Sequence, residues 1–194
     1  MKHIALILAV SSMIVTLGCS ATGDPNKALA NAAVEGRPAA VRAALGSGAD
    51  ANNRFEGGQT PLMLACMRAS SNEDVLEVVK ALVDAGADVN LETHDGRTAM
   101  GWAANSTRLD LVMYLFDSGA EISMQTQKGW TPLMAASIRG EPSVVRYLLE
   151  SGADPAVSDS TGRTARSIAE REGYNEIVEL IDAALAEIEA NTAG

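Results

Sequence analysis

Residues 58–63 read GQTPLM and residues 129–134 read GWTPLM, so the chain contains nearly the same hexapeptide twice. The G-x-T part of this stretch recurs at intervals of 38, 33 and 33 residues, beginning at Gly58, Gly96, Gly129 and Gly162. A second marker, Gly-Ala followed by an acidic residue, keeps the same intervals and begins at Gly48, Gly86, Gly119 and Gly152. Two markers in one phase indicate an internal repeat, and a repeat of this length decides the fold.

Each repeat has the pattern of two helices. Thr60-Pro61 and Thr131-Pro132 place a capping hydroxyl before a proline, as at a helix N-terminus, and a short apolar run follows. After a polar break, apolar pairs at helical spacing predict a second helix, which ends at the glycine of the Gly-Ala-acidic triplet. One unit alone would expose too much apolar surface, so neighbouring units must stack.

The pattern G-x-TPL, then two alanines, then GAD and N resembles ankyrin repeats, whose period is 33 residues. The resemblance implies an all-α solenoid of about five helix-turn-helix units with short β-hairpin loops. We expect a repeat domain over 27–190, with units at about 27–54, 55–92, 93–125, 126–158 and 159–190. Ankyrin repeats usually have histidine after TPL, but Met63, Gly101, Met134 and Ser167 stand there. These replacements predict a stack held more by packing than by a polar ladder.

The first eighteen residues have the pattern of a secretion signal. A short basic start precedes the apolar run of residues 4–17, which is too short for a bilayer core that needs roughly 20 residues. We therefore predict a signal peptide over 1–18. The alternative is an N-terminal hydrophobic helix that stays in the fold.

The end of this segment, VTLGC, resembles the lipobox of bacterial lipoproteins. The resemblance implies that Cys19 is lipidated and becomes the N-terminus, although Thr16 stands where that motif usually has leucine. In that family Ser20 after the cysteine implies delivery to the outer membrane. We therefore expect a periplasmic protein anchored to the outer membrane through a polar tether over 19–26. A soluble periplasmic or secreted protein is the alternative.

Cysteine and charge limit the environment and the partners. Cys66 is the only other cysteine and lies in a helical apolar pattern, where it would pack as a small hydrophobe, with a disulfide to Cys19 as the alternative. Without Lys2 the chain has fourteen basic and 25 acidic side chains, a net charge of −11. This charge disfavours nucleic acid and anionic lipid surfaces and favours a basic protein partner. We expect a monomer that meets the membrane only through its lipid anchor.

The sequence lacks the residue groups that catalysis or metal binding requires. His94 is the only histidine beyond the predicted signal, and one histidine with one thiol makes no recognisable zinc site. The acidic residues of the GAD triplets recur with the repeat, which indicates a role in turns rather than a catalytic pair. The methionines follow the apolar phases and are expected to fill gaps in the core. We predict no catalysis, no metal and no cofactor, with an enzyme or a metal-handling protein as the remote alternative.

Ankyrin stacks bind proteins along a concave face made of loop tips and the ends of the first helices. Carried over to this chain, that face predicts eight partner-binding residues: Glu56, Gln59, Met67, His94, Arg97, Lys128, Trp130 and Arg139. The sequence thus predicts a non-catalytic protein–protein interaction module tethered in the bacterial envelope. An immunity or inhibitor protein for a toxin and a helper of a periplasmic enzyme are alternatives within this class.

The two tryptophans are expected to differ. Trp102 takes a position that ankyrin repeats give to leucine, so we expect it in the core or at its edge. Trp130 aligns with Gln59, Arg97 and Arg163, which predicts a solvent-facing position, where it is either incidental or a binding anchor. Five extra residues near 67–77 form either a tolerated surface insertion or a contact loop.

Overall fold

The computed structural model describes residues 23–69 and 74–192. Cys19, the predicted signal and residues 70–73 of the insertion lie outside this part. Within it, ten α-helices follow one another in five pairs, and no strand is present, so the predicted all-α solenoid is confirmed. The pairs are α2 (Pro25–Val34) with α3 (Pro38–Gly46), α4 (Pro61–Met67) with α5 (Val75–Asp84), α6 (Ala99–Asn105) with α7 (Leu109–Asp117), α8 (Pro132–Arg139) with α9 (Pro142–Glu150), and α10 (Ala165–Glu172) with α11 (Asn175–Thr192).

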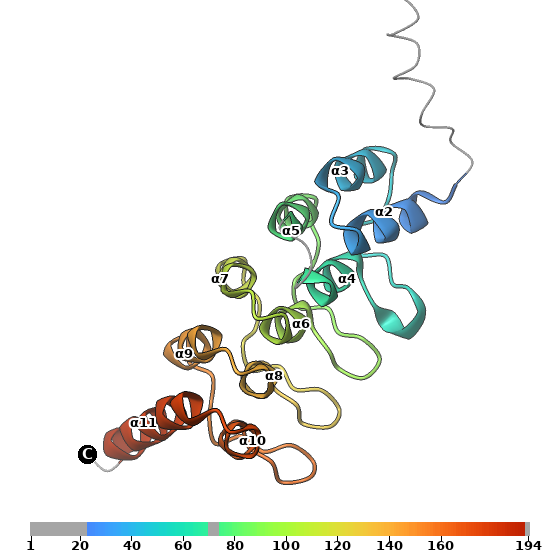
Figure 1. Ribbon diagram of the computed structural model, residues 1–194. Helices are drawn as coiled ribbons and strands as arrows, with labels where there is room; N and C mark the ends of the chain where they lie inside the picture. Colours follow the sequence, from blue (N-terminus) through green and yellow to red (C-terminus); the bar gives the residue numbers. More distant parts are fainter. Residues whose placement is uncertain (1–22, 70–73, 193–194) are drawn as a thin grey trace, which may run out of the picture.

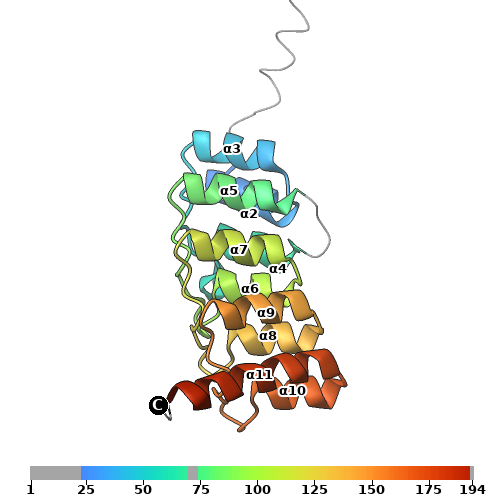
Figure 2. The same cartoon turned by 90° about the vertical axis from the view of Figure 1, so that its left-hand side faces the viewer.

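The helices stand in two rows (Figure 1). The first helices of the pairs, α2, α4, α6, α8 and α10, form an inner row, and the second helices form an outer row. The loops that join successive units project from the inner row, away from the outer one. Figure 2 shows the pairs one above another, with α11 extending beyond the others. The inner row is continuous, because α2, α4, α6 and α8 each pack against the next inner helix.

Threonine side chains begin the inner helices of the last four units. The Oγ1 atoms of Thr60, Thr98, Thr131 and Thr164 each accept a hydrogen bond from the backbone N–H three residues later, at 3.2–3.3 Å. Losing such a cap typically costs about 1 kcal/mol. The recurring threonine of G-x-T therefore sets where each inner helix starts.

Apolar side chains of both rows fill the space between them. In α9, for example, Val144, Val145 and Leu148 are fully buried, and Leu149 is partly buried against the core. Met63, Met100 and Met134 are buried with them, as expected for methionines that fill the core, whereas Met113 is exposed. Cys66 carries a free thiol in the same core, and burial raises its pKa to about 12. Its side chain thus behaves as a small hydrophobe, as expected.

The loop tips correct one part of the sequence prediction, because within the described residues the expected β-hairpins do not form strands. The last loop has one isolated bridge, between Ser158 and Thr164. Each tip is instead a tight turn, closed for example by the Thr126 N–H, which donates to the Trp130 carbonyl at 3.0 Å. The capping threonine of the next helix follows at once, so no residues remain to lengthen a ladder.

The backbones of neighbouring tips are joined to one another. The N–H groups of His94, Gln127 and Ser160 donate to carbonyls of the preceding tip, at 2.8, 3.0 and 2.8 Å respectively. Gly129 permits one of these approaches: its φ is +74°, and a Cβ there would lie 3.1 Å from the Cα of Asp159. The tips therefore form one continuous rim along the inner row.

A second set of hydrogen bonds joins the segments between units. The Asn52 carboxamide accepts from the Asp88 N–H and donates to the Gly86 carbonyl, and Asn90 repeats this pattern with Glu121 and Gly119. The stack thus has polar bridges between units although the usual histidines are missing, in addition to the packing that the sequence predicted. In the next unit this repeat position is occupied by Ser123. Ser123 and Asp154 line a cavity of about 290 Å³.

One close contact gives a direct test of this packing. Gly140 ends α8 in the left-handed conformation at φ +73°, and a Cβ there would lie 2.4 Å from the Tyr174 ring. An alanine in the left-handed conformation costs about 1–2 kcal/mol. Because of the additional clash with Tyr174, we expect Gly140→Ala to lower the free energy of unfolding by more than this. The melting temperature, measured by circular dichroism, should fall by about 2–4 °C per kcal/mol.

Gly152→Ala is the matched control, because Gly152 has φ +93° but no heavy atom near its Cβ position. Equal losses in the two variants would show that Tyr174 does not restrict the space at Gly140.

Candidate binding groove

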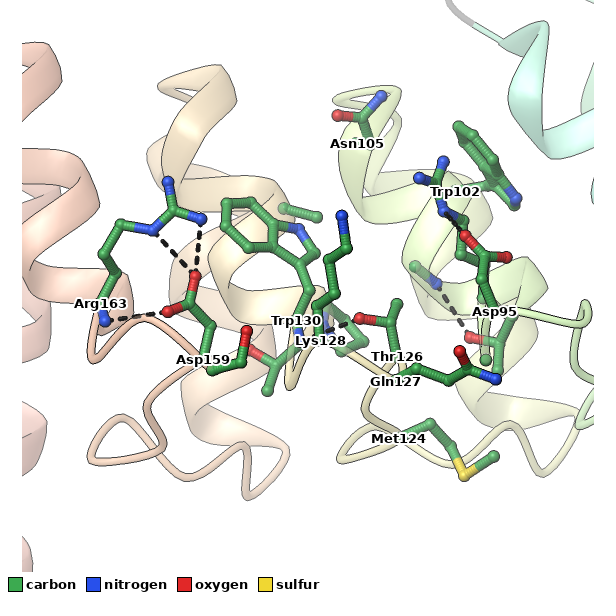
Figure 3. Close-up of a pocket in the computed structure, with 18 of the residues that line it drawn as sticks. Asp95, Trp102, Asn105, Met124, Thr126, Gln127, Lys128, Trp130, Asp159 and Arg163 are labelled. Atoms are coloured by element: carbon green, nitrogen blue, oxygen red, sulfur yellow. Dashed lines mark hydrogen bonds and ion pairs between the residues drawn. The ribbon is translucent and has the colours of Figure 1, made fainter.

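One groove stands out on the inner face, with a volume of about 450 Å³. It runs from α6 across the tips of the last three loops, and its lining includes Trp102 and Asn105 from α6 (Figure 3). Lys128 and Trp130 come from the loop before α8, and Arg163 comes from the loop before α10. The groove thus joins residues from three successive units.

Each tryptophan in the groove is covered by an arginine. The Arg97 guanidinium lies 5.1 Å from the Trp102 ring centroid, and that of Arg163 lies 5.3 Å from the Trp130 ring centroid. Such cation–π contacts hold both partners in place. Arg97 covers a tryptophan of its own unit, whereas Arg163 reaches back to the preceding one. The Trp130–Arg163 contact therefore joins two units.

Small residues line the groove together with the two indoles. Gly101 and Ala135 both line it, where the second unit has Met63 and Leu64 at the equivalent positions. Ala135 also aligns with Trp102, so adjacent units place a small and a large residue at the same repeat position. This alternation leaves a cleft between the Trp102 and Trp130 side chains.

Two aspartates fix the arginines. Asp159 is 6% exposed and accepts from the Thr161 hydroxyl at 2.7 Å and from Arg163 Nε at 2.8 Å. These hydrogen bonds hold the pKa of the Asp159 carboxyl well below its usual range. Asp95 repeats the arrangement, since the Thr93 hydroxyl and Arg97 lower its pKa.

Lys128 differs from the two arginines. Its side chain is exposed, and in Figure 3 it stands between the Trp130 and Trp102 indoles. Within the described residues its ammonium group has no ion-pair or hydrogen-bond partner. Lys128 is therefore available to a ligand in the groove.

The structure brings together three of the eight predicted binding residues, Arg97, Lys128 and Trp130. His94 is exposed beside the groove, and its carbonyl accepts from the Gln127 carboxamide at 2.7 Å. The other four lie outside the groove lining: Glu56 and Gln59 at the tip of the second unit, Met67 at the end of α4, and Arg139 at the end of α8. Their role in binding stays a prediction.

The two tryptophans are more alike than the sequence indicated. Trp130 is only partly exposed. Its side chain packs against the core, and the Arg163 guanidinium lies over its ring. Trp102 packs at the core edge, as expected, but it also lines the groove. Sequence reasoning did not place Trp102 in the site. The small Ala135 at the equivalent position of the next unit was the signal that could have found it.

The family comparison agrees with this architecture. A family model described as "Ankyrin repeats (3 copies)" matches residues 6–93, 29–126, 67–159 and 103–192. The chain belongs to the ankyrin-repeat family. Ankyrin repeats are generic protein–protein interaction modules, and the proteins that carry them are typically non-catalytic. No curated protein matched the chain.

Two further observations concern only the described part of the chain. No helix in it has the length and apolar character that a bilayer span requires. In residues 23–69 and 74–192, no three His, Cys, Asp or Glu side chains lie together as candidate metal ligands.

The low pKa of Asp159 predicts a pH-dependent contribution to stability. Because folding lowers this pKa, the contribution is complete above the unfolded value near 3.8 and is lost as pH falls below it. We expect Asp159→Asn to lower the melting temperature at pH 7, and the gap to wild type to narrow below about pH 4. Thermal unfolding between pH 2 and 7 measures this.

Asp84→Asn is the control, since Asp84 is exposed at the end of α5. A gap for Asp159→Asn that stays constant over this pH range would contradict the prediction.

Proposed function

We propose that this chain is a non-catalytic protein-binding module, tethered in the bacterial envelope, that binds its partner through the groove between Trp102 and Trp130. The observation that carries this proposal is the pairing of two indoles with two fixed guanidinium groups in one cleft. Tryptophan and arginine are the residue types most enriched among binding hot spots. Their place in a groove of an ankyrin stack favours a protein ligand.

The scaffold around the groove supports this role. The tips that carry Arg97, Trp130 and Arg163 are joined by backbone hydrogen bonds, and Asp95 and Asp159 fix the arginine side chains. A partner therefore meets side chains that are already ordered. Preorganisation of this kind reduces the entropy lost on binding.

The tethering part of the proposal rests on the sequence around Cys19. The lipobox-like VTLGC follows a signal-like segment, and residues 20–26 supply a short polar linker. Cys66 is fully buried with a free thiol, which disfavours a disulfide as the alternative role of Cys19. Anchored in this way, the solenoid would face the periplasm.

The excess of acidic residues favours a partner with a basic surface. The whole chain has a formal net charge of −10, which would speed encounter with an oppositely charged protein. The identity of the captured partner separates the two expected roles: a toxin would indicate an immunity or inhibitor protein, and an envelope enzyme would indicate a helper.

Trp130→Ala tests the binding surface. Removing the indole takes away one wall of the groove, so we expect affinity for a partner isolated from envelope extract to fall at least about tenfold. Pulldown followed by titration of the purified pair measures this. Because Trp130 is partly buried, we expect the melting temperature to fall by no more than about 4 °C.

Met113→Ala is a matched control, because Met113 is an apolar residue, 41% exposed, on α7 of the outer row. The groove is not the binding site if Trp130→Ala leaves the affinity unchanged. The same conclusion follows if Met113→Ala lowers the affinity as much as Trp130→Ala does.

Cys19→Ser tests the tether. We expect this change to move the protein from the membrane fraction to the soluble fraction and to abolish incorporation of labelled palmitate. Cys66→Ala should leave both properties unchanged, because Cys66 lies in the core. Membrane association that persists in Cys19→Ser would rule out the lipid anchor.

A further inference from the structure

We infer that the groove binds an extended peptide segment in which an acidic residue lies next to an apolar one, such as proline or phenylalanine. The carboxylate pairs with Lys128, the apolar side chain enters the cleft between the two indoles, and the peptide backbone bonds to Asn105. This inference rests on the proposed function and specifies the segment of the partner that the groove recognises.

The charge of the groove is opposite to that of the protein. Its lining has three basic side chains, Arg97, Lys128 and Arg163, against two carboxylates, Asp95 and Asp159. Both carboxylates are already in ion pairs, with Arg97 at 2.8 Å and with Arg163 at 2.7 Å. The unpaired charge is that of Lys128, so the groove attracts an anion although the whole chain is acidic.

A basic segment would fit this groove poorly. A lysine or arginine placed there would face the Lys128 ammonium, and like charges brought together at an interface oppose binding. It would find no free carboxylate among the groove residues, because Asp95 and Asp159 are held by arginines. A basic surface of the partner would instead meet the acidic exterior of the solenoid.

The cleft between the indoles takes an apolar side chain. Its lining includes the Trp102 and Trp130 rings together with Gly101, Pro132 and Ala135. The volume of about 450 Å³ falls within the range of about 300–1,000 Å³ typical of small-ligand pockets. It therefore holds a few side chains of an extended segment rather than a folded element of the partner.

Asn105 distinguishes a peptide from a simple anion. Its side chain lines the groove on α6 (Figure 3), and no hydrogen bond to its carboxamide is present within the described residues. A carboxamide offers both donors and an acceptor, and an extended peptide has N–H and C=O groups that need partners. The groove thus provides a group for the backbone as well as one for the carboxylate.

Selection from a random peptide library on the immobilised chain tests the inference. We expect wild type to enrich peptides with Asp or Glu next to proline or an aromatic residue. Lys128→Glu should enrich peptides with Lys or Arg in place of that Asp or Glu. Lys27→Glu is the matched control, because it makes the same charge change at an exposed residue of α2, outside the groove. It should enrich the same peptides as wild type.

Intrinsic fluorescence then measures affinity at the site itself, because both tryptophans of the chain line the groove. Replacing the selected acidic residue of a peptide by its amide should weaken binding to wild type about fivefold. The same replacement should have no effect on binding to Lys128→Gln. Asn105→Ala should lower the affinity for the peptide, but the amide replacement should still weaken binding to this variant about fivefold.

Enrichment of basic or charge-independent peptides by wild type would overturn the inference, and so would an unchanged preference in Lys128→Glu. If no peptide is selected, yet a partner protein is bound and Trp130→Ala weakens it, the proposed function stands and the inference fails. If the partner protein is also bound equally well by Trp130→Ala, the groove has neither role.

Discussion

The contact of each inner helix with the next one is the interaction on which the rest of this structure depends. One helix pair cannot bury its own apolar face, so Met134 and Leu148 are excluded from water only because neighbouring units cover them. The same stacking sets the spacing of the loop tips and allows their backbones to bond in series. The groove is thus a product of the stack, since no single unit contains both of its walls.

Within this regular stack, the groove arises from differences between units. Trp102 and Ala135 occupy the same repeat position, and their difference in size opens the cleft. A second repeat position is occupied by Arg97, Trp130 and Arg163 in successive units. Arg97 covers the Trp102 ring, and Arg163 covers the ring of Trp130. A uniform repeat would give a uniform surface, whereas these substitutions concentrate aromatic and basic groups at one place.

The fold was predictable because its signals are local and recur. The capping threonines, the helix-ending glycines and the apolar pairs all depend on nearby residues, and the repeat shows each of them several times. The groove was only partly predictable, because its geometry depends on contacts between units. Sequence alignment placed Trp130 among polar residues and so suggested a solvent-facing side chain, but Arg163 from the next unit covers it. The small residues that line the cleft, Gly101 and Ala135, belong to no motif that would mark them as part of a binding site.

The asparagine ladder described above has one missing rung. Asn90 bridges to Glu121, but Ser123 is too short to repeat the bridge to Asp154, and a cavity of about 290 Å³ lies there instead. This gap separates the connecting segments that lead to Trp130 and to Arg163. A small rotation between these two units would move Trp130 against Arg163 without breaking an asparagine bridge. Between the connecting segments, the units that carry Trp130 and Arg163 are therefore joined by one asparagine bridge fewer than the units before them.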